Sequence, residues 1–333
     1  MKRFFYYPLS KLCLNNINYF SESCKNFLKM RIIFYNILPF NVFIKMKNGY
    51  LILLSFILII VFSCNQPVKE KDIPTPVKQR KKPAATGYHF ETAKIWLAQN
   101  KTDSVNKNIV FSVNRTDTQN FAKMDTVIIP NDLSGDIEFY LPFPLTVPAI
   151  KQISKVIYFS YPTQVFAAYQ NGELVQTGPV NMGRKKDQTP TGLFFANWKA
   201  EKTNSTFNDE WELLWNFNIE NKLGVGWHQY SLPGYPASHS CLRLQENDAR
   251  TLYDWADQWQ LDDKENVLLN GTAVIVFGSY NFDAPKPWLQ LVANPTILDI
   301  PAAQIEQVTS PFIQDILKWQ NLRIQQDTVQ SKQ

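Results

Sequence analysis

The chain has 333 residues, of which 45% are hydrophobic and 19% are charged, enough for one large domain or two smaller ones. The formal net charge is +5, but the first 63 residues hold eight basic residues and one acidic residue, so the rest carries a net charge of −2. This distribution leaves no basic stripe in the folded part and argues against a nucleic-acid partner.

The segment 46–63 has the layout of a secretory signal. Lys47 precedes a 13-residue apolar run, Tyr50–Phe62, and Ser63 then stands before Cys64. The run is short for a membrane-spanning helix, which needs about 20 residues. The cysteine after the run resembles the lipobox of bacterial lipoproteins, although Phe62 is bulkier than usual there. The resemblance implies that Cys64 is acylated and anchors a periplasm-facing protein of the cell envelope; an uncleaved membrane anchor is the alternative.

Two further N-terminal segments flank this signal. We interpret residues 1–45 as a non-native extension upstream of a start at Met46, with a long n-region as the alternative. Residues 64–87 are rich in Pro and Lys and predict a flexible tether.

Residues 88–150 predict a small α+β subdomain. The stretch "ETAKIWLAQN" favours a short helix, and Val127–Ile129 favours a strand closed by Pro130. The pattern "VNRTD…MDTVIIP" resembles the second half of a LysM peptidoglycan-binding module, and an ordinary capping subdomain is the alternative.

The region 151–283 predicts a compact, mainly β domain with few helices. Its β-branched and aromatic runs are broken by turns, and Asn171-Gly172 between two runs indicates a hairpin. Apolar residues at 3–4 spacing predict a helix over 246–259. The C-terminal extension 284–333 contains one more helix candidate, "SPFIQDILKWQNLRIQQ".

One stretch, "PGYPASHSCLRL", concentrates the reactive side chains. Cys13 and Cys24 lie upstream of the signal, so Cys241 is the one thiol left beside the lipidation site. His228 and His239 are two of only three histidines and lie within 13 residues of it. An imidazole within reach can take the thiol proton and leave a nucleophilic thiolate.

Two other interpretations of these residues stay open. The three side chains could bind zinc, but the spacing H-x10-H-x-C lacks a fourth ligand and matches no usual structural site. Alternatively, the residues cluster by chance around a buried, inert cysteine.

These residues resemble the catalytic domain of L,D-transpeptidases of the YkuD type. That family has an upstream His, a Ser/Thr-His-Gly-Cys box and often an Arg after the cysteine. Four landmarks of this kind occur in order between about 155 and 280: "NMGRKKDQTPTGLF"; His228 together with the box Ser238-His239-Ser240-Cys241 and Arg243; "NDARTLYDWA"; and "GTAVIVF". Ser240 replaces the family's glycine, which would cost about 1 kcal/mol if the position needs a positive φ.

The resemblance implies a YkuD-like β-sandwich and acyl transfer on peptidoglycan stem peptides. Cys241 would attack the stem and form a thioester, terminal D-Ala would leave, and an amine of a second stem would complete a 3→3 cross-link. His228 would be the base, oriented by a backbone carbonyl near Gln229, and His239 would line the site. The remaining assignments, to the oxyanion hole or to substrate binding, are Ser238, Ser240, Arg243, Gln229 and Trp227.

The resemblance also bears on partners and rival functions. No metal or organic cofactor is implied, and a monomer is expected. Donor and acceptor stem peptides and, through the lipid, a membrane are the expected partners. An L,D-carboxypeptidase using the same acyl-enzyme is one alternative, and an inactive wall-binding lipoprotein is another. The basic turn at 184–188 is interpreted as a solvated hairpin tip.

Overall fold

The computed structural model describes residues 79–205 and 211–330, and residues from Lys78 onward form one compact unit. The predicted signal segment and the predicted lipidation site at Cys64 lie outside the described residues. Within the described ranges, no helix combines the length and the apolar character needed to cross a membrane.

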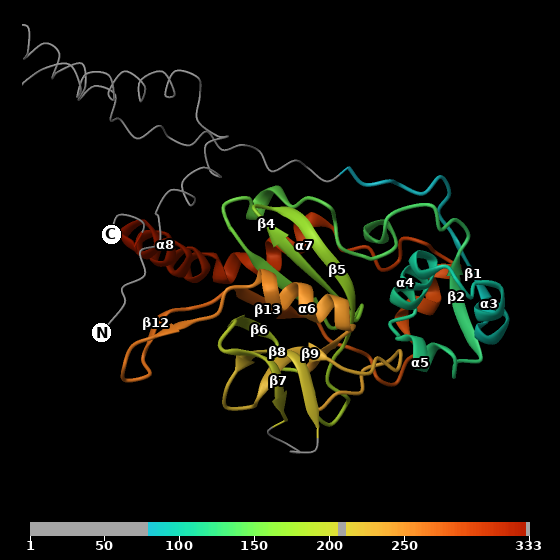
Figure 1. Cartoon of the computed structure of the whole chain (residues 1–333). Helices are drawn as coiled ribbons and strands as arrows, with labels where there is room; N and C mark the ends of the chain where they lie inside the picture. Colours follow the sequence, from blue (N-terminus) through green and yellow to red (C-terminus); the bar gives the residue numbers. More distant parts are fainter. Residues whose placement is uncertain (1–78, 206–210, 331–333) are drawn as a thin grey trace, which may run out of the picture. The chain divides into compact units, whose positions relative to one another are not determined.

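The largest element is a curled, mixed sheet of nine strands (Figure 1), which confirms the prediction of a mainly β domain with few helices. Its spatial order is β6-β13-β3-β4-β5-β10-β9-β8-β7. The strands are β3 (Val156–Ser160), β4 (Val165–Gln170), β5 (Glu173–Asn181), β6 (Gly192–Phe195), β7 (Lys199–Asn204), β8 (Glu212–Glu220), β9 (Val225–Gln229), β10 (Leu242–Leu244) and β13 (Ala273–Phe277).

The antiparallel centre of the sheet forms where the sequence predicts it. Asn171 and Gly172 have φ of 51° and 80°, the left-handed conformation that a two-residue hairpin turn needs, and they join β4 to β5. Two neighbouring pairs are parallel instead: β13 beside β3, and β10 beside β9. The second pair brings the two parts of the predicted site together.

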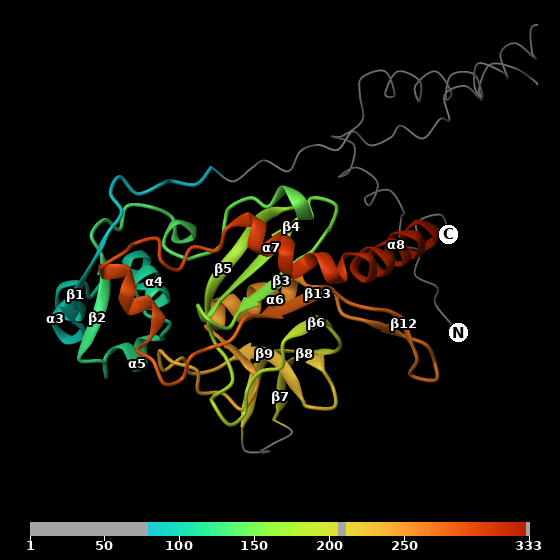
Figure 2. The same ribbon diagram turned by 180° about the vertical axis from the view of Figure 1, so that it is seen from behind.

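The two faces of the sheet bury separate hydrophobic clusters. Helix α6 (Glu246–Trp255) covers one face, whose core includes Trp227 and Phe217. Helices α7 (Ala302–Thr309) and α8 (Ile313–Gln330) flank the other face, as Figures 1 and 2 show from opposite sides. The remaining short elements are β11 (Gln260–Leu261), β12 (Val267–Leu269) and the 3₁₀ helices η3 (Ile137–Phe139), η4 (Pro148–Ile150), η5 (Pro287–Val292) and η6 (Ser310–Phe312).

Helix α6 ends earlier than its sequence pattern predicts. The pattern extended to Trp259, but Ala256 is already extended, with ψ of 144°. The backbone N–H of Trp259 instead donates to the carbonyl of Asn197, 3.1 Å away, and β11 begins at the next residue. Pairing with neighbouring backbone therefore prevails over local helical periodicity there.

Residues 88–130 enclose a small core of their own. The elements are β1 (Tyr88–Thr92), α3 (Ala93–Gln99), α4 (Ser104–Val113), α5 (Thr118–Phe121) and β2 (Thr126–Pro130), with β1 and β2 antiparallel. The sequence reading missed α4, whose start is marked by the Asp103 carboxylate accepting from the N–H of Asn106 at 2.9 Å. The LysM-like interpretation stays a prediction.

A buried arginine joins this small core to the sheet domain. Arg115 is 1% exposed and donates from Nε to the carbonyl of Thr163 at 2.7 Å. Its guanidinium also lies over the ring of Trp288 in η5, 5.4 Å from the ring centroid. The C-terminal extension thus packs against the N-terminal part of the described chain, and not only against the sheet.

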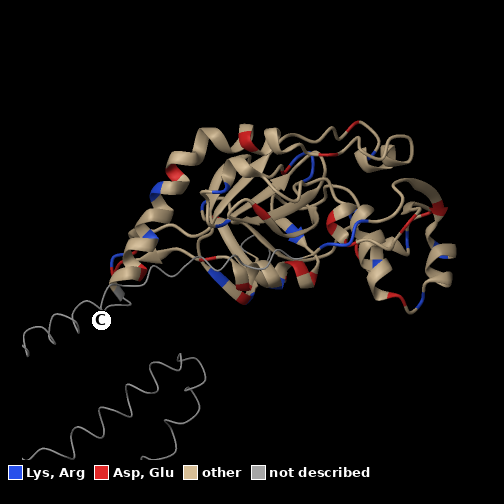
Figure 3. Cartoon of the chain, turned by 90° about the horizontal axis from the view of Figure 1, so that it is seen from above, with Lys and Arg blue, Asp and Glu red and all other residues tan. Residues whose placement is uncertain are grey.

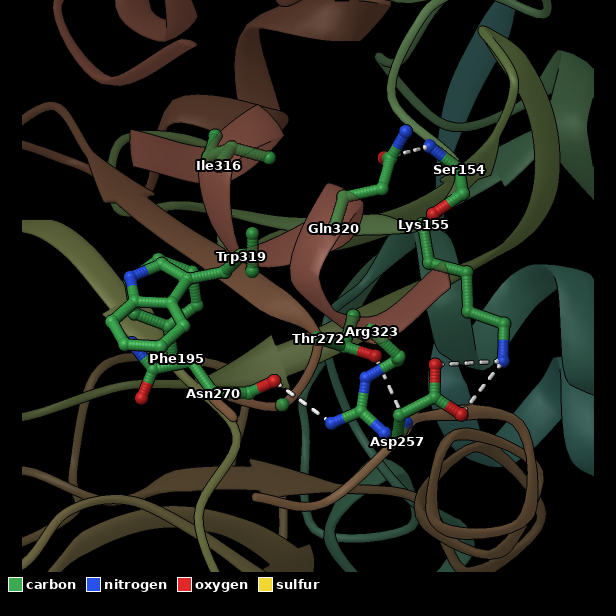
Figure 4. Close-up of a pocket in the computed structure, with 12 residues that line it drawn as sticks. Ser154, Lys155, Phe195, Asp257, Asn270, Thr272, Ile316, Trp319, Gln320 and Arg323 are labelled. Atoms are coloured by element: carbon green, nitrogen blue, oxygen red, sulfur yellow. Dashed lines mark hydrogen bonds and ion pairs between the residues drawn. The ribbon is translucent and has the colours of Figure 1, made fainter. Parts of the chain in front are cut away.

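Polar contacts fasten the C-terminal helix beside a small pocket (Figure 4). The amide oxygen of Gln320 accepts from the backbone N–H of Ser154 at 2.7 Å, and Arg323 donates to the carbonyl of Asn270 at 2.8 Å. Charged residues elsewhere are of both signs and interspersed (Figure 3), in keeping with the absence of a basic stripe in the described part of the chain.

Candidate active site

The parallel pairing of β9 with β10 positions the reactive residues. Arg243 lies opposite His228 in this register, and Cys241 comes two residues before Arg243. Because alternate residues of an extended segment point to one side, Cys241 and Arg243 share the face that His228 occupies. The turn-rich segment 230–240 makes the return connection that the sequence predicted.

The structure gathers the main candidates around one pocket. His228, His239, Cys241 and Arg243 all line it. The other lining residues are Ser205, Trp211, Leu213 and Tyr230. Sequence reasoning missed three of them, Ser205, Trp211 and Leu213, because they come from β8 and from the segment before it, which carries no reactive side chain to mark it.

His228 is held as a neutral base. Its side chain is 3% exposed, and Nδ1 lies 2.9 Å from the carbonyl oxygen of Gln229. A carbonyl can only accept, so Nδ1 carries the proton and Nε2 keeps its lone pair. Burial lowers the pKa of His228 to about 4, a shift that the nearby Arg243 reinforces and the Gln229 carbonyl opposes.

Cys241 is half-buried and is the one free cysteine among the described residues. Its thiol donates to the carbonyl of Gly224, with sulfur and oxygen 3.7 Å apart. Burial raises the pKa of the thiol, against smaller opposite effects of the Gly226 backbone and Arg243. The sequence led us to expect a thiolate kept ionised by imidazole; the surroundings of the sulfur favour a neutral thiol beside a neutral His228.

The box serines shape the loop that carries the thiol. The Ser238 hydroxyl donates to the carbonyl of Cys241 at 2.5 Å. The carbonyl of Ser240 accepts from the hydroxyl of Thr189 at 2.8 Å, and that same hydroxyl accepts from the N–H of Gly183 at 2.9 Å. The Thr-Pro-Thr-Gly landmark therefore fastens the loop before β6 to the cysteine loop.

Ser240 has a φ of 77°, the left-handed conformation that favours glycine. Ser240→Gly is expected to raise the free energy of unfolding by about 0.5–1 kcal/mol, because removed strain exceeds the added freedom of the unfolded chain. Ser240→Val is expected to lower it by about 1–3 kcal/mol, since a β-branched residue resists this φ. Urea unfolding curves measure both; equal stabilities of the two variants would contradict the strain argument.

The remaining candidates differ in their access to the pocket. The guanidinium of Arg243 lies 4.6 Å from the ring centroid of Tyr230, and it has no carboxylate partner among the described residues. Gln229 supplies the carbonyl at His228, while its side chain lines a neighbouring groove. Trp227 is 0% exposed and packs on Phe217, 4.5 Å between ring centroids, which favours a place in the core; its assignment to substrate binding stays a prediction.

The basic turn at 184–188 is not simply a solvated tip. Arg184 places Nη2 3.2 Å from Nδ1 of His239, and its Nε donates to a carboxylate oxygen of Asp187 at 2.6 Å. Lys185 and Lys186 are exposed, as expected. The sequence showed the charges of this turn, but not that one of them would contact the box histidine.

The zinc interpretation requires at least three ligating side chains close together. Within residues 79–205 and 211–330, no group of three or more His, Cys, Asp or Glu side chains is arranged to hold a metal ion. His239 and His228 already use Nδ1 in contacts with Arg184 and the Gln229 carbonyl.

Comparison with known proteins identifies the domain. The family model of the L,D-transpeptidase catalytic domain, YkuD, matches residues 154–276. A search of the curated proteins gave no match.

Among solved structures, an L,D-transpeptidase from Stackebrandtia nassauensis is 23% identical with a TM-score of 0.31, the match covering 38% of this chain and 57% of that one. An L,D-transpeptidase from Mycobacterium smegmatis is 21% identical with a TM-score of 0.30, covering 38% of this chain and 59% of that one. The chain thus spans less than two thirds of the length of these structures. On the evidence of the family model, this chain carries a catalytic domain of the YkuD L,D-transpeptidase family.

Proposed function

We propose that this protein is an L,D-transpeptidase that forms 3→3 cross-links between peptidoglycan stem peptides through a thioester on Cys241. The supporting observation is one pocket, inside the family-matched region, lined by a thiol, two imidazoles and a guanidinium without a carboxylate partner in the described part of the chain. A nucleophile, a neutral base and a cationic binding group are what acyl transfer from a carboxylate-bearing peptide requires.

Acylation begins with the neutral thiol. As sulfur attacks the carbonyl carbon of the third stem residue, the thiol proton passes to Nε2 of His228, and the carbonyl oxygen gains negative charge. Backbone N–H groups at Ser240 and Cys241 stabilise that oxyanion, a contribution of about 2.7–4 kcal/mol per donor. The carbon–nitrogen bond then breaks, the proton on Nε2 goes to the leaving amine, and D-Ala departs.

In the second step, in which the thioester is resolved, His228 again acts first as base and then as acid. An amine of another stem attacks the thioester carbonyl, His228 takes the amine proton, and the proton returns to sulfur as the thiol leaves. Water in place of the amine would make the enzyme an L,D-carboxypeptidase with the same acyl-enzyme. Arg243 is held over the Tyr230 ring, in a suitable place to bind a stem carboxylate.

We further propose that the protein works in the cell envelope as a monomeric lipoprotein. The acyl chain would be carried by Cys64, and residues 64–87 would give the reach between membrane and wall. Residues 88–150 would form an accessory subdomain packed on the catalytic domain, and residues 284–333 would complete the packing around it.

Incubation of the full-length protein with purified tetrapeptide muropeptides tests the activity. We expect dimers linked 3→3 together with released D-Ala, identified by mass spectrometry. Tripeptide without dimers would replace the transpeptidase proposal by the carboxypeptidase one. Unchanged tetrapeptide, from protein shown to be folded by circular dichroism, would reject both and favour an inactive wall-binding protein.

A further inference from the structure

The loop between β5 and β6 lies directly against the segment that carries His239. The backbone N–H of Arg184 donates to the carbonyl of Ser238 at 3.0 Å. The backbone N–H of Asp187 donates to the carbonyl of Arg184, also at 3.0 Å, and this hydrogen bond closes a turn. An added Cβ at Gly183 would lie 2.2 Å from the carbonyl oxygen of Asp187, so only glycine permits this close turn. The position of the Arg184 side chain is therefore set by backbone contacts on both sides.

Three side chains meet where this loop reaches the site. Nη2 of Arg184 is 3.2 Å from Nδ1 of His239, whereas the nearer carboxylate oxygen of Asp187 is 3.7 Å from that nitrogen. Asp187 instead accepts from Nε of Arg184 at 2.6 Å. The distance of 3.2 Å is within hydrogen-bond range and that of 3.7 Å is not.

The chemistry of guanidinium decides where the His239 proton sits. Arginine has donors only and stays protonated, so a hydrogen bond from it requires a lone pair on the ring nitrogen. A neutral ring with its lone pair on Nδ1 must carry its proton on Nε2. The carboxylate of Asp187 would enforce the opposite tautomer if it were the closer partner.

We propose that Arg184 is a positioning residue that fixes His239 in the neutral tautomer with hydrogen on Nε2, so that His239 serves the pocket as a hydrogen-bond donor. Asp187 holds the guanidinium in place through its Nε. His228, with its proton on Nδ1, keeps its lone pair on Nε2 and is the acceptor. The two histidines of the pocket are thus set to opposite roles by different partners.

This division of roles deepens the proposed function and rests on it. A donor beside Cys241 stabilises the sulfur as its proton leaves, or the charge that develops on the attacked carbonyl oxygen. The charged groups near His239 are Arg184, Lys186 and Asp187 of the loop and Arg243 of β10. Burial and then Arg184 lower the pKa of His239, so the ring is neutral near neutral pH and can donate only through its one N–H.

Nitrogen-15 chemical shifts of the imidazoles test the proposal without any assay of activity. The chain has only three histidines, so full-length protein gives three ring spin systems, and His89→Gln removes one of them. In wild type we expect His239 as the tautomer protonated on Nε2 and His228 as the one protonated on Nδ1. A His239 protonated on Nδ1 in wild type would overturn the proposal without any variant.

Variants of the loop separate the hydrogen bond from charge. Arg184→Met is expected to shift His239 toward protonation on Nδ1, because Asp187 then becomes the nearest partner. Lys186→Met removes a nearby positive charge that makes no hydrogen bond to the ring, and it should leave the tautomer unchanged. Arg184→Lys keeps the positive charge but replaces the branched guanidinium, with its several N–H donors, by a single ammonium group. His239 should then show populations of the two tautomers between those of wild type and Arg184→Met. An unchanged tautomer in both Arg184 variants would overturn the proposal.

Kinetics then connect the tautomer to the proposed reaction. The rate constant for acylation of Cys241 by a carbapenem should fall about tenfold in Arg184→Met. In Lys186→Met it should change by no more than about twofold. If the rate constant fell equally in both variants, the role of Arg184 would be only that of a nearby positive charge. If wild type is not acylated at all, the proposed function fails, while the tautomer measurement still stands.

Discussion

Cys241→Ala is expected to abolish formation of any covalent adduct when the full-length protein is incubated with a carbapenem. The reason is chemical: the sulfur is the group that would form the new bond, and alanine offers no nucleophile in its place. Peptide mapping of wild type should locate the adduct on Cys241, and cross-linking and release of D-Ala should disappear together in the variant. Intact-protein mass spectrometry and product analysis measure the two effects.

A matched variant keeps this result from being explained by misfolding. Cys241→Ser replaces only the sulfur by oxygen and keeps a polar hydrogen at this position, so it should retain the wild-type unfolding curve. Its hydroxyl remains a far weaker nucleophile beside a neutral imidazole, so the adduct should still be lost or be strongly slowed. Wild-type activity in either variant would show that Cys241 is not the nucleophile, and the proposed mechanism would have to be abandoned.

Local sequence patterns predict the strands around the site well, because strands and tight turns depend mainly on residues that are close together in the chain. Asn171-Gly172 adopts the positive φ values that its hairpin needs, and the runs on either side become β4 and β5. The box at 238–241 likewise marks the reactive residues by type and spacing. What such patterns do not contain is the sheet order, and in particular the parallel pairing of β10 with β9.

The parts of the site that the sequence reading missed depend on that order. Trp211 and Leu213 reach the pocket only because β8 lies beside β9, and Arg184 contacts His239 only because the β5–β6 loop packs on the box. Trp227 shows the reverse case. Its place next to His228 in sequence suggested the cleft, but alternation along β9 turns it into the opposite face and into the core.

The protonation states at the site depend on burial as well as on residue type. A thiol near two imidazoles suggests an ion pair when only residue types are considered. In the structure, burial disfavours the charged form of both partners: it raises the pKa of the Cys241 thiol and lowers the pKa of His228. Both shifts favour the neutral pair, so the proton should move during attack and not before it.

His228→Gln is accordingly expected to lower the acylation rate constant by about 10²–10⁴-fold, the usual contribution of a general base. Glutamine preserves polarity and approximate size but cannot take the proton. His89→Gln is the control, because His89 is an exposed histidine on β1 and should leave the rate unchanged. Rates come from mass spectrometry of the carbapenem adduct over time.

The pH dependence of the wild-type rate tests the same base without a variant. The lowered pKa of about 4 keeps His228 neutral at higher pH, so its base form is fully present throughout the neutral range and is lost as pH falls through that value. The carbapenem rate should therefore be nearly flat between about pH 5 and 8 and fall at lower pH. Alkylation by iodoacetamide, which follows the thiolate, should instead keep rising past the ordinary thiol pKa. If both rates rose together across this range, a preformed thiolate would be the nucleophile, and His228 would not be the base that drives attack.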